Sequence, residues 1–124
     1  MHRSRLCAIG VDVPAEVHDP AATFWTGALG GPGQPDEDGT YVEAGHFGPG
    51  REVFVQRLGS GPARIHLDIE TDDVEAEVAR LEQLGATRVE QVRSWWVMRD
   101  PAGLAFCVVP PQSDHFPEGA TEWP

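Results

Sequence analysis

The sequence predicts an α+β protein made of two βαβββ modules, and three observations support this fold class. The order of one strand, one helix and three strands occurs twice along the 124 residues, which indicates an internal repeat. Each half carries a helix that is preceded by aspartate and followed by glycine. Between the halves, the segment Gly-Ser-Gly-Pro at 59–62 interrupts both periodic patterns, as expected of a boundary.

The first module is expected to span residues 1–59. Residues 6–13 form a β-branched run that ends at Pro14, which predicts a strand. Asp19 is expected to cap a helix with Pro20 at its first position, and Gly30 and Gly31 are expected to end it. The predicted apolar face of this helix consists of Ala21, Phe24, Trp25 and Ala28, with Trp25 in the core. Further strands are predicted at 40–44 and 52–58, and a short additional one is considered at 34–38.

The second module is expected to span residues 60–110. Residues 64–71 alternate strictly, with Ile65, Leu67 and Ile69 on one face and His66, Asp68 and Glu70 on the other. The expected helix begins at an aspartate cap and ends at Gly85, and its apolar face comprises Val74, Val78 and Leu81. Three strands are predicted to follow, at 87–92, 95–99 and 104–109. Residues 111–124 are rich in proline and are predicted to be an irregular tail.

Composition excludes several classes of partner and location. A formal net charge of -11 argues against binding to nucleic acid or to an anionic membrane. No apolar run approaches the ~18 residues of a membrane span, and no secretory signal is recognisable. Two cysteines are too few for a disulfide framework, so a cytoplasmic protein is expected. All nine basic residues are arginine, a bias typical of GC-rich bacterial genomes.

The order of these motifs resembles the vicinal oxygen chelate superfamily, the glyoxalase and bleomycin-resistance group. The resemblance rests on HLDIETDDVEAEVARLEQLGA and RDPAGLAFCVV in the second half, and on VDVP, DPAATFW and ALGG in the first. It implies that the two modules form a curved mixed sheet around a central cup. Since the superfamily contains lyases, dioxygenases, epimerases and non-catalytic drug binders, the resemblance alone does not decide the function.

The resemblance also implies where a metal ion would bind. Metal-dependent members hold one divalent ion with ligands from the first and last strand of each module, commonly His, Glu, His and Glu. The matching positions here are Arg5, Gln56, His66 and Cys107. Arginine cannot ligate a cation, glutamine offers only a neutral oxygen, and cysteine is a soft ligand. No metal cofactor is therefore expected at this position, with a divalent metal as the alternative.

The remaining candidate residues each have a functional and a structural interpretation. His66 can act as a base, ligand or hydrogen-bond donor, or it can anchor a polar network. Asp68 can orient His66, although a salt bridge with Arg5 or Arg57 is favoured. Arg5 can clamp a carboxylate or phosphate, or neutralise Asp68. Cys107 can be a reactive thiol beside an arginine, although a small buried hydrophobe is favoured. Phe54 and Trp96 (or Trp95) can wall an apolar pocket, while the three histidines His18, His46 and His115 are assigned to the surface.

These observations favour a glyoxalase-like protein that binds a small organic molecule in the cup. The proposed pocket consists of Arg5, Phe54, Gln56, His66, Asp68, Trp96 and Cys107, and His66 is the candidate catalytic residue. The alternative is a metal-dependent lyase, isomerase or dioxygenase that uses His66, so enzymatic activity stays open. An interaction module with a filled cup is a third possibility. By resemblance, a homodimer is expected.

Overall fold

The computed structural model describes residues 1–124 as two compact units, each with its own hydrophobic core. We name them by their places in the sequence. The central unit contains residues 8–66, and the terminal unit contains residues 1–7 and 67–124. The strands β1 (His2–Pro14) and β5 (Arg64–Thr71) each contribute residues to both units. No helix is long and apolar enough to cross a membrane.

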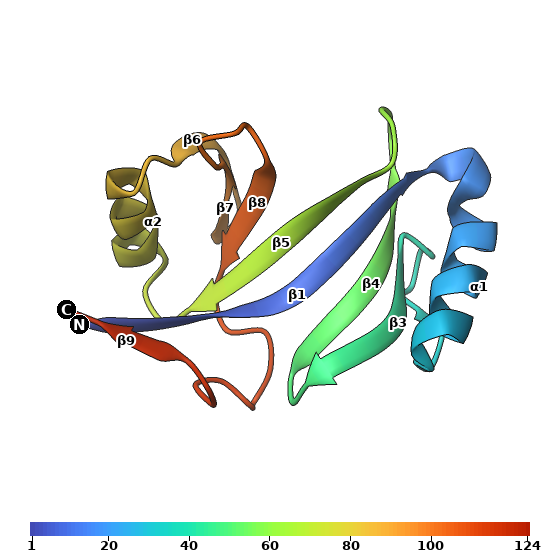
Figure 1. Cartoon of the computed structure of the whole chain (residues 1–124), viewed down its shortest axis with the longest axis horizontal. Coiled ribbons are helices and arrows are strands. Elements are labelled where there is room, and N and C mark those ends of the chain that lie inside the picture. Colours follow the sequence, from blue (N-terminus) through green and yellow to red (C-terminus); the bar gives the residue numbers. More distant parts are fainter. The chain divides into compact units, whose positions relative to one another are not determined.

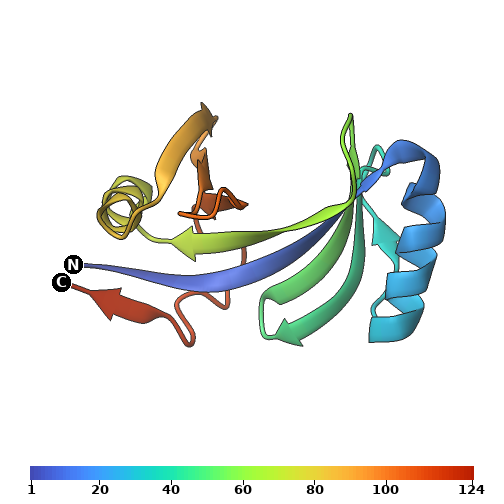
Figure 2. The ribbon, with the colours of Figure 1, turned by 45° about the horizontal axis from the view of Figure 1, so that its top comes forward.

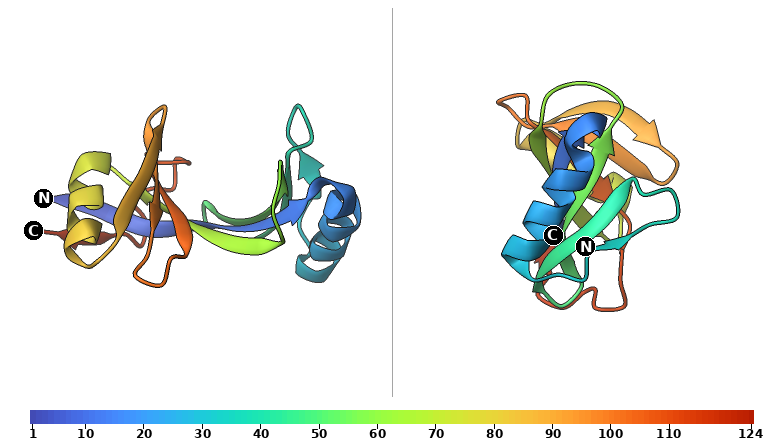
Figure 3. Two further views of the ribbon diagram at one scale, coloured as in Figure 1. Left: turned by 90° about the horizontal axis from the view of Figure 1, so that it is seen from above. Right: turned by 90° about the vertical axis from the view of Figure 1, so that its right-hand side faces the viewer.

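The central unit contains two helical segments and the strands of the first repeat. Its elements after β1 are η1 (Ala15–Val17), α1 (His18–Leu29), β2 (Gln34–Pro35), β3 (Tyr41–Gly48) and β4 (Arg51–Leu58). β4 runs parallel to β1 and antiparallel to β3, and β2 pairs with β3 at the edge. One side of this sheet is covered by α1, which lies along β3 and β4 (Figure 3). The core between helix and sheet consists of Val13, Ala22, Val42, Ala44 and Val55, with Trp25 packed against it as predicted.

The start of α1 differs from the sequence prediction. The helix begins one residue before Asp19, its N-cap is Val17, and no side chain caps it. Asp19 instead lies in the first turn, where its negative charge still favours the helix dipole. His18, the first residue of the helix, is buried rather than on the surface, and Phe24 is exposed although it was assigned to the apolar face.

The terminal unit repeats the same arrangement. Its elements are α2 (Val74–Gln83), β6 (Thr87–Val92), β7 (Trp95–Arg99), β8 (Ala105–Val109) and β9 (Thr121–Trp123), together with most of β5. β8 runs parallel to β5 and antiparallel to β7, which pairs with β6 (Figure 1). As predicted, Asp73 caps α2: its carboxylate accepts a hydrogen bond of 3.1 Å from the amide of Ala76. The core of the unit consists of Val78, Met98 and Val108.

The tail is more regular than the sequence suggested, because β9 pairs antiparallel with the start of β1. This pairing brings the two chain ends side by side within the terminal unit (Figure 2). The indole of Trp123 donates a hydrogen bond of 2.9 Å to Ser4 Oγ and stacks under the guanidinium of Arg80. Such contacts depend on a strand that lies far away in the sequence, which explains why the tail alone gave no strand signal.

The exposure of the side chains on the two faces of β5 also differs from the prediction. Ile65 and Leu67, on the apolar face, are 54% and 41% exposed. Glu70, on the polar face, is fully buried. The polar residues His66 and Glu70 are therefore less exposed than the apolar residues Ile65 and Leu67, the reverse of what the alternation predicts.

Glu77 is a buried carboxylate at the centre of a polar cluster in the terminal unit. It accepts hydrogen bonds from Arg80 Nε and Nη2 at 2.8 and 2.9 Å, and His2 Nε2 lies 2.8 Å from Oε1. Burial disfavours the charged form, but the hydrogen bonds from Arg80 and His2 outweigh it and hold the pKa of Glu77 below its usual value of 4.5. A carboxyl with a depressed pKa stabilises the folded state above its unfolded pKa, and this contribution disappears as the pH falls through the folded pKa.

We therefore expect Glu77→Gln to destabilise the protein by about 1.5–3 kcal/mol at pH 7, the range of hydrogen bonds to charged groups. The difference from the wild type should shrink as the pH falls below 4.5, because the carboxyl of the unfolded wild type is then protonated first and that of the folded state follows at lower pH. Urea unfolding between pH 7 and pH 3 measures this difference. A difference that stays constant over that range would show that the charge of Glu77 contributes nothing.

Candidate functional site

The central unit holds a histidine and an aspartate in close contact. His66 Nδ1 lies 2.7 Å from Asp12 Oδ2, and the two side chains are only 12% and 6% exposed. Arg64 Nε lies 3.8 Å from the same oxygen of Asp12 and adds a positive charge beside the carboxylate. A neutral imidazole that donates from Nδ1 to Asp12 has Nε2 as an acceptor. This tautomer is the one that can bind a donor group or take up a proton.

Aromatic rings and a glycine fix the position of the His66 ring. The ring of Phe54 contacts it edge-on, with centroids 5.6 Å apart, and Tyr41 contacts Phe54 in the same manner at 5.2 Å. On its other side the imidazole lies against the backbone of Gly10, where a Cβ would come within 2.7 Å of Nδ1 and closer still to Cε1. Gly10 is therefore the residue that makes room for His66 on this face.

These residues lie on the face of the central sheet that α1 does not cover. Phe54 is in register with Gly10 of β1, and Gln56 is in register with Asp12. Phe54 and Gln56 are two residues apart and hence share a face. The opposite face carries the core residues Val13 and Val55. The structure thus places three of the predicted pocket residues, Phe54, Gln56 and His66, on one surface, and adds Asp12 and Tyr41 to them.

Three other predicted residues, Arg5, Asp68 and Cys107, belong to the terminal unit. The Arg5 guanidinium is buried: Nε donates to Glu70 Oε2, and Nη1 donates at 2.7 Å to the carbonyl of Glu118 in the tail. Asp68 and Cys107 are neighbours in register on β5 and β8. Glu70 is the acidic partner that the sequence did not single out, although its place on the polar face of β5 was correctly inferred.

Trp96 lies on the side of the terminal sheet that is covered by α2. It packs against the core of this unit, and its indole donates a hydrogen bond of 3.2 Å to Glu75 on that helix. The guanidinium of Arg88 stacks on its ring, 4.9 Å from the centroid. Trp96 thus covers apolar core residues, on the face away from the one where a pocket wall was expected.

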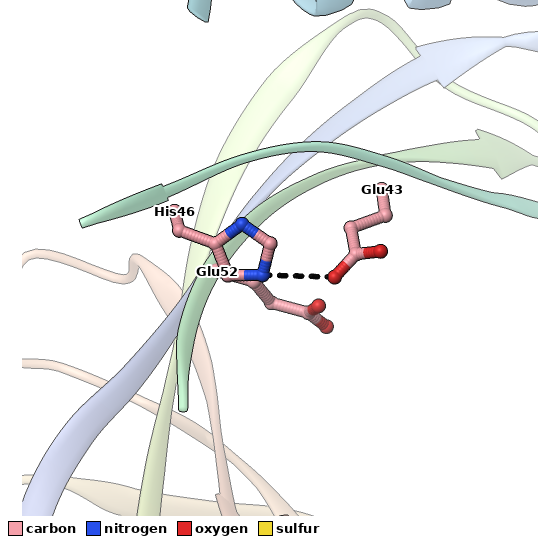
Figure 4. Close-up of side chains that lie close together, drawn as sticks. All are labelled: Glu43, His46 and Glu52. Atoms are coloured by element: carbon pink, nitrogen blue, oxygen red, sulfur yellow. Dashed lines mark ion pairs between the residues drawn. The ribbon is translucent and has the colours of Figure 1, made fainter. Parts of the chain in front are cut away.

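A second polar cluster on the central sheet was not expected from the sequence. Glu43, His46 and Glu52 gather on the β3–β4 hairpin, and one potential ligand atom from each lies within 4.8 Å of the others (Figure 4). His46 lies at the surface, as predicted, with its side chain 50% exposed. The sequence offered no signal for the cluster, because residues three apart in a regular strand point to opposite faces.

Comparisons with known proteins agree with the predicted fold class. The sequence profile of the family described as "Glyoxalase-like domain" matches residues 8–109. The crystal structure of methylmalonyl-CoA epimerase from Mycobacterium tuberculosis is similar, with a TM-score of 0.53 at 18% identity over 87% of this chain and 88% of that one. A glyoxalase I mutant from Zea mays aligns with a TM-score of 0.31 at 18% identity, over 85% of this chain and 45% of that one. No curated protein sequence is significantly similar to this chain.

The profile match covers most of the chain, and the similarity to the epimerase structure supports the fold. Both confirm the α+β arrangement of two βαβββ modules that the sequence predicted. The chain therefore belongs to the glyoxalase-like domain family of the vicinal oxygen chelate superfamily.

Proposed function

We propose that this protein binds a small, planar organic molecule on the face of the central sheet opposite α1. The observation that carries the proposal is the His66 imidazole, which Asp12 holds at 2.7 Å and Phe54 supports from the side. An apolar wall with a few fixed polar groups is typical of small-molecule sites. Gln56, on the face of Phe54, supplies a further donor and acceptor.

Ligand binding without the metal of the superfamily is favoured by the side chains at the inherited positions. Arg5 is cationic, buried and bound to Glu70, so it offers no lone pair to a metal ion. Gln56 supplies a neutral oxygen and Cys107 a soft sulfur, which leaves His66 as the one residue of the usual type. This donor set does not fit the hard divalent ion of metal-dependent members.

An enzyme of the lyase or isomerase class is the second candidate, and the contact between His66 and Asp12 favours it. A carboxylate on Nδ1 orients the ring and stabilises the imidazolium that forms when Nε2 accepts a proton. A substrate bound beside His66 would then lose a proton to Nε2. Turnover by the wild type that disappears in Asp12→Asn, with binding retained, would distinguish catalysis from binding alone.

A thermal-shift screen with aromatic carboxylic acids and antibiotics tests the binding proposal. A compound that binds the folded state at 100 times its dissociation constant stabilises it by about 2.7 kcal/mol. We expect such a compound to raise the melting temperature of the wild type and of His115→Ala. The shift should be lost in His66→Ala and reduced in Phe54→Leu.

His115 is a suitable control because it is a half-exposed histidine of the tail with an acidic neighbour, Glu118, at 3.7 Å. Chelator is present throughout, so that metal ions do not contribute to the shift. A compound that stabilises His66→Ala as strongly as the wild type would contradict the proposed site. The absence of any stabilising compound would favour an interaction module.

We also propose that the protein is a homodimer in a bacterial cytoplasm. The exposed apolar side chains of Ile65 and Leu67 on β5 support a protein partner for that strand. The low cysteine content supports a reducing compartment. A mass of one chain in light scattering at micromolar concentration would contradict the dimer.

A further inference from the structure

We propose that Glu43, His46 and Glu52 form a binding site for a divalent transition-metal ion on the β3–β4 hairpin. The site differs from the inherited position, whose ligands come from the first and last strand of each module, because two of its three residues lie on β3. It also goes beyond the proposed ligand binding, since neither His66 nor an organic molecule is needed to form it.

A β-bulge creates the cluster. Glu43 is in register with Phe54, Gly45 with Val53 and His46 with Glu52, so one extra residue of β3 is accommodated between Glu43 and Gly45. In a regular strand, Glu43 and His46 would point to opposite faces. The extra residue reverses the alternation and brings both side chains to the face of Phe54 and Glu52. Bulges that redirect a side chain in this way are over-represented next to active sites.

The geometry of the three side chains suits a metal ion. His46 Nε2 lies 2.9 Å from Glu43 Oε1, and the donor atoms of all three residues lie within 4.8 Å of one another. An ion about 2.0–2.2 Å from each donor keeps its donors within about 4 Å of each other, so small side-chain rotations are sufficient. The cluster is half-buried, with Glu43 33% and His46 50% exposed, so the ion can enter from solvent.

The donor set indicates which ion it is. Two carboxylates offset the charge of a divalent cation, and an imidazole favours Zn²⁺, Ni²⁺, Co²⁺ or Fe²⁺ over Mg²⁺, which prefers six oxygen ligands. Three protein ligands leave positions for water or a ligand, as in catalytic rather than structural metal sites.

The site lies next to the pocket wall. Glu43 is opposite Phe54, the residue whose ring contacts His66, and neighbouring strands are about 4.8 Å apart. The open positions of the ion would therefore border the surface on which the organic molecule is proposed to bind.

Titration calorimetry with Zn²⁺ alone, on protein stripped of metal, tests the site. We expect one saturable equivalent of Zn²⁺ in the wild type. The affinity should be at least about tenfold to hundredfold weaker in His46→Ala, Glu43→Gln and Glu52→Gln, since even the loss of a residue that only hydrogen-bonds to a ligand has an effect of about this size. His115→Ala is the matched control, because His115 and Glu118 form the same i, i+3 pair without a third ligand. Circular dichroism verifies that each variant folds.

Several results would overturn the proposal. One is the absence of saturable Zn²⁺ binding; another is binding that His46→Ala retains. Binding lost in His66→Ala and retained in His46→Ala would place the ion at the inherited position instead. Mg²⁺ that binds as tightly as Zn²⁺ would contradict a role for the imidazole. None of these results bears on the organic ligand, whose binding is measured in the presence of chelator.

Discussion

Glu70→Ala is expected to destabilise the protein by about 3–5 kcal/mol, the usual effect of leaving one partner of a buried ion pair without the other. Glu70 is fully buried, and it accepts hydrogen bonds from the guanidinium of Arg5 and from the amide of Gln112. Arg5 in turn donates to the carbonyl of Glu118. Urea unfolding measures the loss in stability, and limited proteolysis should show earlier cleavage in the tail after residue 110.

Two further variants make this prediction specific. Arg3→Ala removes a similar contact, the 2.9 Å pair with Asp72, but both side chains are partly exposed, so a loss of about 0–1 kcal/mol is expected. Replacing both buried partners, as in Arg5→Met with Glu70→Leu, should recover much of the lost stability, because no unpaired charge stays buried. If Glu70→Ala lowered the free energy of unfolding no more than Arg3→Ala does, the buried pair of Arg5 and Glu70 would not stabilise the terminal unit.

Gly10→Ala is expected to displace His66 and to abolish ligand binding on the central sheet. The new methyl group would occupy the space of the imidazole, and relief requires the ring to move away from Asp12. Overpacking of this kind destabilises by about 1–3 kcal/mol. Stability is measured by urea unfolding, and the position of the ring by nitrogen-15 NMR of the His66 side chain.

Gly27→Ala provides the comparison, because it makes the same change where nothing lies within 4 Å of the new carbon. Gly27 is within α1, so alanine should stabilise the helix by about 0.5–1 kcal/mol. An unchanged imidazole spectrum in Gly10→Ala, together with wild-type stability, would refute the role assigned to this glycine.

The local structure of the second module could be predicted closely from sequence. The strands at 64–71, 87–92 and 95–99 have the predicted bounds, because strict alternation and turn residues define them. Asp73 caps its helix as expected. In the first module the helix N-terminus was misplaced, since Asp19 and Pro20 have the residue types of a cap but lie within the first turn.

The site was harder to predict, because it depends on contacts between distant strands. Asp12 was not among the candidate residues, and nothing local in the sequence indicated that His66, 54 residues later, would bind it. The pattern of Ala8, Gly10 and Asp12 on one face of β1 was the available signal, since small residues indicate a close approach. The bulge in β3 breaks the periodicity on which face assignments depend, so the cluster around His46 could be recognised only in three dimensions.

The way in which the chain is divided between the units has a consequence for its synthesis. The central unit is one continuous segment, residues 8–66, and the terminal unit combines residues 1–7 with residues 67–124. Since chains emerge from the ribosome N-terminus first and fold by units, the central core can form while later residues are still being added. The first residues of β1 must wait longer than the rest of that strand, because their partner strand, Thr121–Trp123, is made only after the whole central unit.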